Sequence, residues 1–206
     1  MERPVRGENR IDDVQVRRWL VDRERQRQRT ASHGRVPVIT VSREYGARGA
    51  AVGRIVAKRL SFQFWDRELA GEQQDIATLA AAADELAARG GAVLIGRGLG
   101  FLLDASRALR VRIVCPLEQR VAGLVEREGI CEDTARATIA YADRARREFV
   151  QEVYCCDIDD VSGYDLWIST ATISLEAAAA VIIAAYRYRF GEQVMSAIGH
   201  AQGGAG

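Results

Sequence analysis

The chain has 206 residues, of which 48% are hydrophobic and 28% are charged, and its formal net charge is +1. This length and composition suffice for one good hydrophobic core, and a charge so close to zero gives no overall field favouring nucleic acid or membranes. The four cysteines form no C-x-x-C pair, and both histidines lie in segments expected to be flexible. These patterns argue against a zinc site and against catalysis by serine–histidine or cysteine–histidine pairs.

The first 35 residues are polar and rich in arginine, and they predict a basic helical extension followed by a linker. This extension is either a solvated helix or a basic arm that contacts RNA or a partner, and it is the only segment for which we consider nucleic acid. The sequence shows no signal-peptide pattern and no apolar run of transmembrane length. We therefore expect a cytoplasmic, reduced protein that does not associate with membranes, of unknown oligomeric state.

Residues 36–59 predict a buried strand, a glycine-bearing turn at Gly46–Gly49 and a helix. Such an arrangement directs backbone N–H groups and a helix N-terminus at one point, which favours phosphate binding. The turn is not a standard G-x-x-x-x-G-K-[ST] loop, because the residues after Gly46 include neither the lysine nor the hydroxyl of that pattern. Spacing alone leaves two interpretations open, a phosphate-binding turn or an ordinary tight β–α turn.

Two further polar groups follow predicted strands. Asp66 ends the aromatic strand 62–65, where it either orients a sugar, base or metal or caps a helix. The apolar strand 92–95 follows an alanine-rich helix at 76–89 and runs into Gly96, Arg97 and Gly98. An arginine held between glycines just after a strand is well placed to clamp an anion.

The second half of the chain predicts a strand at 109–115, a helix from 117 to Gly129, and another helix from about Glu132. One face of this second helix carries charged side chains, which form either an anion-binding surface or a surface lattice of salt bridges: Arg136, Asp143 and Arg147, with Arg144 at the edge. A last strand is predicted at 166–169 and a closing helix at 175–190, before a flexible tail at 191–206.

The alternation of strands and helices predicts an α/β fold with a doubly wound, parallel sheet of about five strands. Ligands of such sheets bind at the carboxyl ends of the strands. Residues 42–49, Asp66 and Gly96–Gly98 all fall there. We expect Arg97 to lie within roughly 20 Å of Gly46, a span of about six extended residues.

Six stretches resemble, in the same order, the cytidylate kinase-like family of P-loop nucleoside monophosphate kinases: VITVSREYGARG, FWDREL, GGAVLIGRG, VRIVCPLEQRV, ADRARREFV and YDLWIST. The resemblance covers about residues 36–185. It implies a P-loop kinase-like domain at 36–190 with a helical lid at about 130–160. It also implies transfer of the γ-phosphoryl group of ATP to CMP or dCMP, with Mg²⁺.

The resemblance implies roles for particular residues as well. Residues of the turn would cover the ATP phosphates, namely Gly46, Ala47, Arg48 and Gly49. Arg97 would bind the acceptor phosphate, Asp66 would lie near the acceptor nucleotide, and Arg144 and Arg147 match the lid arginines. These roles suit phosphoryl transfer, which depends mostly on positioning and on neutralising the charge of phosphoryl oxygens.

The turn departs from the G-S-G-G-R-E pattern usual in this family, because Arg48 stands at a glycine position and Ala50 and Ala51 replace the arginine and the glutamate. It retains no hydroxyl for magnesium. The segment 71–82 is also short where an acceptor subdomain is expected. Two hypotheses therefore stay open, a kinase and a catalytically impaired nucleotide-binding or regulatory module. Arg48 either supplies the cation that the missing lysine would give or blocks the phosphates; we expect partial rescue, so that Arg48 counts among the catalytic residues.

Overall fold

The computed structural model describes residues 36–66, 81, 85, 91–96, 98–103 and 105–202, except for the side chains of 192–202. Its centre is a five-stranded sheet in the order β2-β3-β1-β4-β5, in which each neighbouring pair is parallel. The strands are β1 (Val38–Arg43), β2 (Gln63–Asp66), β3 (Ala92–Ile95), β4 (Ala108–Val114) and β5 (Leu166–Ser169). The predicted α/β fold class with a parallel sheet is confirmed.

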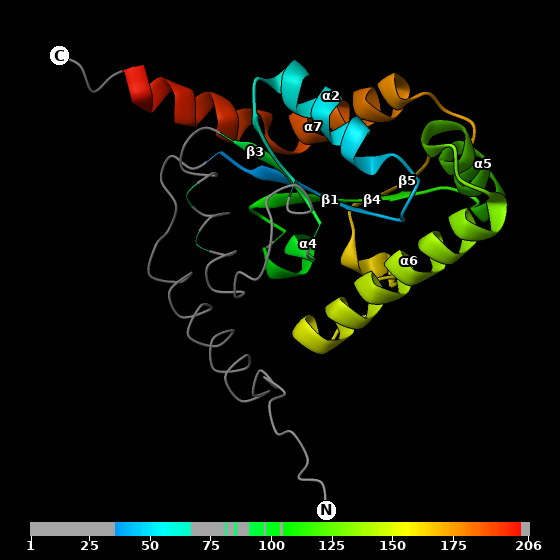
Figure 1. The fold of residues 1–206 in the computed structure, drawn as a ribbon. Helices are drawn as coiled ribbons and strands as arrows, with labels where there is room; N and C mark the ends of the chain where they lie inside the picture. The colour runs from blue at the N-terminus through cyan, green and yellow to red at the C-terminus, as the bar shows by residue number, and fades with distance from the viewer. Residues whose placement is uncertain are drawn as a thin grey trace, which may run out of the picture. The chain divides into compact units, whose positions relative to one another are not determined.

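Helices lie on both sides of this sheet (Figure 1). They are α2 (Gly49–Leu60), α4 (Leu99–Leu102), α5 (Leu117–Glu128), α6 (Glu132–Tyr154), the 3₁₀ turn η1 (Val161–Gly163) and α7 (Leu175–Gln202). Figure 1 shows α2 and α7 on one face of the sheet, and α4 and α6 on the other. Within the described residues, none of the helices combines the length and the apolar character that a membrane span requires.

The core lies mainly between the sheet and the pair α2 and α7. The central strand β1 has a hydrogen-bonded neighbour on each side, and helices cover both faces of the sheet (Figure 1). Because both faces are covered, β1 carries a nearly continuous run of buried β-branched residues. Helix α2 approaches β3 closely at Gly53, where a Cβ atom would lie 2.6 Å from Ile95 Cδ1. On α7, Ile182 and Phe190 are almost fully buried in the same core. This packing fixes α2, and with it the turn that precedes the helix.

Helix α7 is longer than predicted. It passes through Gly191, where we expected a flexible tail to begin, and ends at Gln202. A single glycine costs a helix about 1 kcal/mol relative to alanine, which is too little to end a helix anchored in the core just before this point by Phe190. The chain divides between His33 and Gly34. The predicted extension 1–35 and the predicted helix 76–89, apart from residues 81 and 85, lie outside the described residues.

Asp165, just before β5, binds two arginines and gives a pH-dependent contribution to stability. Its carboxylate accepts hydrogen bonds from the Arg110 backbone at 2.7 Å and the Arg110 guanidinium at 3.1 Å, and it pairs with Arg189 at 2.9 Å. Burial raises the pKa of Asp165, but these hydrogen bonds outweigh burial, and the net pKa is lowered.

We expect Asp165→Asn to destabilise the protein by about 2 kcal/mol at pH 7, because hydrogen bonds to a charged group are lost. A lowered folded-state pKa contributes stability that is present above the unfolded pKa and is lost as the pH falls through the folded value. The gap between the wild type and the variant should therefore narrow below about pH 4, in urea unfolding measured from pH 7 to pH 3. A gap independent of pH would contradict this linkage.

Candidate active site

The turn between β1 and α2 contains two residues with a positive φ and leads directly into the helix N-terminus. Gly46 has a φ of 85°, and Arg48, the residue before the first turn of α2, has a φ of 62° in the left-handed region. Glycine adopts this conformation without the cost of about 1–3 kcal/mol that other residues incur. Arg48 therefore occupies a position that favours glycine. Helix α2 starts at Gly49 without an acidic residue in its first turn, so the partial positive charge of its N-terminus is not offset there.

Two cavities adjoin this turn. The first, here called the α6 cavity, has a volume of about 280 Å³ and is lined by the ends of β1 and β3 and by α6, including Ser42, Arg43, Tyr45, Gly96, Arg146 and Phe149. The second, the α5 cavity, has a volume of about 460 Å³, and its lining includes Gly46, Arg48, Gln119, Arg127, Thr170 and Glu176. One turn thus contributes residues to two separate cavities.

Arg43, which lines the α6 cavity, forms a buried ion pair with Asp66. Their strands β1 and β2 are not neighbours, since β3 lies between them. The Arg43 side chain nevertheless reaches across, and its Nη2 atom lies 3.6 Å from Asp66 Oδ1. Both side chains are nearly fully buried, with 7% and 5% of their surface exposed. Asp66 therefore pairs with a guanidinium at the carboxyl ends of the strands. The sequence had left two roles open for Asp66, orienting a ligand and capping a helix.

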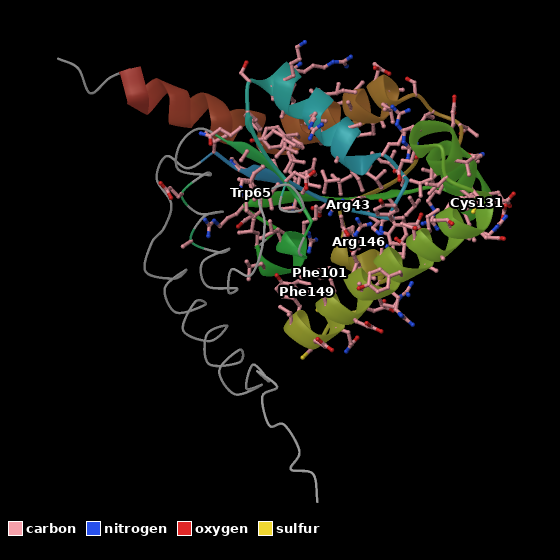
Figure 2. The ribbon with its side chains drawn as sticks, viewed as in Figure 1. Arg43, Trp65, Phe101, Cys131, Arg146 and Phe149 are labelled. Atoms are coloured by element: carbon pink, nitrogen blue, oxygen red, sulfur yellow. The ribbon has the colours of Figure 1, made fainter. Side chains whose placement is uncertain are left out.

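Arg146 is the arginine that α6 contributes to the α6 cavity. Its Nη1 atom donates a hydrogen bond to the backbone oxygen of Arg43 at 3.2 Å, and its guanidinium lies 5.4 Å from the centre of the Tyr45 ring. Figure 2 labels Arg43 near the end of the sheet and Arg146 on α6. The guanidinium is therefore held against the turn by contacts with its backbone and with an aromatic ring.

The lid arginines implied by the family resemblance lie elsewhere on α6. Arg144 is 67% exposed and pairs with Glu148, and Arg147 is 54% exposed and pairs with Asp159. Neither of them lines the α6 cavity. Successive helical residues differ in direction by about 100°, so Arg146 faces the cavity while its neighbours face away.

Arg136, on the same helix, pairs with Glu118 and Glu132 on the surface. This part of the charged face of α6 is therefore a lattice of salt bridges.

The turn is also held from α5 and α6 by a cluster of charges. Asp143 Oδ1 accepts a hydrogen bond from the Tyr45 N–H group at 2.7 Å, and Asp143 Oδ2 accepts one from Arg120. Arg120 also donates to the Tyr45 carbonyl at 3.2 Å and lies 3.7 Å from Glu44, whose carboxylate accepts the Cys115 N–H. Arg120, buried on α5, thus orients the turn through Tyr45, Glu44 and Asp143.

The hydroxyl of Ser42, on the wall of the α6 cavity, is fixed by hydrogen bonds. Arg112 donates to it at 2.9 Å, and the Tyr164 hydroxyl lies 3.3 Å away while donating to the Ile158 carbonyl at 2.8 Å. Burial raises the pKa of Tyr164, so that its hydroxyl stays protonated at neutral pH. Ser42 is thereby presented to the cavity in a defined orientation.

The described residues offer Mg²⁺ no cluster of protein ligands. None of the described His, Cys, Asp and Glu residues forms a group of three that could hold a metal ion. Asp66 is paired with Arg43, and position 50, just inside α2, is an alanine. Magnesium is commonly bound by substrate phosphates and water with only one or two carboxylates.

The chain belongs to the cytidylate kinase-like family, whose model matches residues 38–77 and 72–172. It is similar to a cytidylate kinase from Methanococcoides burtonii, with 31% identity over 131 residues that cover 64% of this chain and 67% of the relative. It is also similar to a cytidylate kinase from Pyrococcus horikoshii, with 33% identity over 101 residues that cover 49% of this chain and 52% of the relative. The match thus spans about half the length of some curated relatives.

The fold is similar to that of a crystal structure of an uncharacterized protein from Eubacterium ventriosum. The TM-score is 0.66 at 23% identity, and the match covers 73% of this chain and 98% of the other. This similarity supports the fold alone.

The structure brings several of the predicted site residues together and leaves others apart. Gly46 and Arg48 line the α5 cavity, and Asp66 pairs with Arg43, which lines the α6 cavity. Ala47 is buried within the turn. Arg97 and the segment 71–80 lie outside the described residues, so the expected separation of Arg97 and Gly46 stays a prediction.

Three arginines of the site were not given a role from the sequence: Arg43, Arg120 and Arg146. No local pattern singles out Arg146, because Arg147, four residues after Asp143, is spaced as suitably on the helix as Arg146, three residues after it.

Proposed function

We propose that this protein transfers the γ-phosphoryl group of ATP to a nucleoside monophosphate, with CMP or dCMP as the acceptor. The observation that carries the proposal is the pair of cavities that adjoin the turn between β1 and α2. A kinase must bring a donor and an acceptor together at a transferring phosphoryl group, and two cavities at one turn suit that task. The family membership and the similarity to cytidylate kinases support the same proposal.

In this proposal ATP binds in the α5 cavity, with its phosphates against the turn Gly46–Gly49 and the N-terminus of α2. Arg48 lines this cavity and is the cation that the turn offers on the donor side. At this position Arg48 can replace the missing lysine. If its side chain instead obstructed the phosphates, it would weaken ATP binding.

The acceptor binds in the α6 cavity, where Arg146 would neutralise its phosphate and the transferring group. For Arg97, which lies outside the described residues, we keep the role in binding the acceptor phosphate that the family resemblance implies. No nucleophilic side chain is needed, because an oxygen of the acceptor phosphate attacks the γ-phosphorus directly and ADP leaves. The protein contributes position and positive charge. Magnesium, when bound with the nucleotide, supplies charge neutralisation to the phosphate oxygens.

An assay of ADP release with ATP, Mg²⁺ and a panel of CMP, dCMP, UMP, AMP and GMP tests this function. We expect turnover with CMP or dCMP above the rate with ATP alone. Thermal unfolding should be measured with the same nucleotides, because a ligand at one hundred times its Kd stabilises the folded state by about 2.7 kcal/mol. The absence of the loop lysine and hydroxyl favours a second candidate, a nucleotide-binding module without catalysis. Stabilisation by ATP without turnover on any acceptor would select it.

A further inference from the structure

The hydroxyl group of Ser42 is held from the neighbouring strand. Ser42 on β1 and Arg112 on β4 are register partners, so their side chains lie on the same face of the sheet. Arg112 Nη1 donates a hydrogen bond to Ser42 Oγ at 2.9 Å, and Arg112 Nη2 donates one to Asp159 Oδ1 at 2.8 Å. The Arg112 side chain is 5% exposed, and its Cζ atom lies 5.9 Å from the centre of the Trp167 ring. This buried arginine therefore fixes the position of the hydroxyl.

The proton of the Ser42 hydroxyl lacks a close partner among the described residues. A guanidinium carries donors and no acceptor, so the Ser42 oxygen accepts from Arg112 and its own proton needs another partner. Within the described part of the chain, that partner is the Tyr164 oxygen at 3.3 Å, since the single Tyr164 proton is directed to the Ile158 carbonyl at 2.8 Å. Hydrogen bonds between hydroxyl groups are usually about 2.7–2.8 Å long. The Ser42 hydroxyl is therefore a donor that a ligand can satisfy better than the protein does.

Ser42 lies beside an apolar part of the α6 cavity. The lining of this cavity includes an aromatic and two aliphatic side chains from α6 and the loop after it, namely Phe149 (Figure 2), Val150 and Ile158. Ile158 is also the residue whose carbonyl binds the Tyr164 hydroxyl, which contacts Ser42. An aromatic ring with aliphatic neighbours gives a surface on which a nucleobase can pack. The donor of Ser42 thus adjoins a surface suited to the uncharged part of a nucleotide.

The charges around Ile158 do not favour a phosphate there. Ile158 belongs to the acidic loop 157–160, whose other three residues are aspartates. The two arginines that bind this loop, Arg112 and Arg147, both pair with the same aspartate, so the loop carries no surplus of positive charge. Arg146 instead lies against the turn between β1 and α2. A phosphate is therefore favoured beside Arg146, and the nucleoside beside Ile158.

We infer that the Ser42 hydroxyl donates a hydrogen bond to an acceptor atom of the nucleoside part of the substrate, with Arg112 as the positioning residue that holds the hydroxyl. Cytosine offers a carbonyl oxygen and a ring nitrogen as acceptors. The inference rests on the proposed function, which brings a nucleoside monophosphate to the α6 cavity. Ser42 contributes affinity and orientation, and no bond to it forms or breaks during the transfer.

The test compares the binding of CMP with the binding of cytidine, which has the same nucleoside and no phosphate. We expect Ser42→Ala to weaken both by the same factor of about five to ten, the usual effect of losing one neutral hydrogen bond. Arg146→Ala should weaken CMP binding more than cytidine binding, because it removes charge beside the phosphate. Ser61→Ala, which removes an exposed hydroxyl at the end of α2 outside the lining of both cavities, is the control and should keep both affinities. Calorimetric titration measures CMP, and competition against CMP measures cytidine.

A double-variant cycle tests the role of Arg112. Arg112→Lys keeps the positive charge near Asp159 and loses the planar fork that binds the hydroxyl and the carboxylate together. If Arg112 acts through Ser42, this change should weaken cytidine binding in the wild type and have little further effect in Ser42→Ala. A purely structural role would give the same loss in both backgrounds. Thermal unfolding without nucleotide checks that each variant is folded, and Ser42→Ala alone tests the hydroxyl if Arg112→Lys unfolds.

Two results would overturn the inference: wild-type affinity for cytidine in Ser42→Ala, or a loss confined to CMP, which would place the hydroxyl at the phosphate. Either result together with CMP turnover by the wild type would leave the proposed function intact. A wild-type protein that neither binds nor turns over nucleotides would refute the proposed function, and this inference with it.

Discussion

Replacing Arg146 with alanine is expected to lower kcat by a factor of about 10²–10³ while the protein stays folded. Arg146 lines the α6 cavity and is held there by the Arg43 carbonyl and the Tyr45 ring. In the proposed reaction its guanidinium stabilises charge that develops only in the transition state, so kcat should fall more than the affinity for CMP. The measurement is steady-state ADP release over a range of CMP concentrations, with circular dichroism to confirm folding.

Arg144→Ala is the matched comparison, because it removes the same charge from the same helix two residues away. Arg144 is 67% exposed and pairs with Glu148. Its replacement should change kcat by less than the replacement of Arg146. If Arg144→Ala lowered kcat as much as Arg146→Ala, the result would support the lid role implied by the family resemblance. It would also indicate that α6 rotates when substrate binds.

Replacing Arg120 with alanine is expected to destabilise the fold by about 3–5 kcal/mol, the usual cost of removing one partner of a buried ion pair. The change leaves Asp143 and Glu44 without the guanidinium that lies between them, and the Tyr45 carbonyl loses a donor. Because these groups hold the turn, the affinity for ATP should fall along with stability. Urea unfolding and titration with ATP measure the two effects.

Arg136→Ala is the control for this prediction, since Arg136 also ties α6 to α5, through Glu118. That pair lies on the surface, where salt bridges contribute little to stability. We expect little change in the urea midpoint. If both variants lost the same free energy of unfolding, the burial of an ion pair between α5 and α6 would not determine its contribution to stability, and the prediction would be wrong.

Local sequence patterns determined the elements of this protein well. The strands predicted at 92–95 and 166–169 have these bounds in the structure, and the helix after residue 117 ends just before Gly129, as predicted. Apolar periodicity and glycine act through neighbouring residues, so that a short window of sequence holds the information. The fold class followed from the alternation of these elements.

Local sequence patterns did not predict which side of α6 faces the end of the sheet. Asp143, Arg144, Arg146 and Arg147 all suit the polar face of a helix, and a sequence periodicity does not say which of them meets the end of the sheet. The packing of α6 against α5 and the turn decides it, through contacts such as the one between Asp143 and the Tyr45 N–H, 98 residues apart. Only the tertiary structure therefore selected Arg146.

The pairing of Arg43 with Asp66 shows the same division. The sequence by itself placed Asp66 and the glycines at positions 46, 49 and 96 at the carboxyl ends of strands. It placed Arg43 within the group 42–49 at the end of the first strand but gave it no role of its own, because nothing local marks a side chain that reaches past the neighbouring strand. The order β2-β3-β1 brings Gly96 between the two charges. The tertiary structure decided this contact because it depends on the space left by glycines from distant parts of the chain.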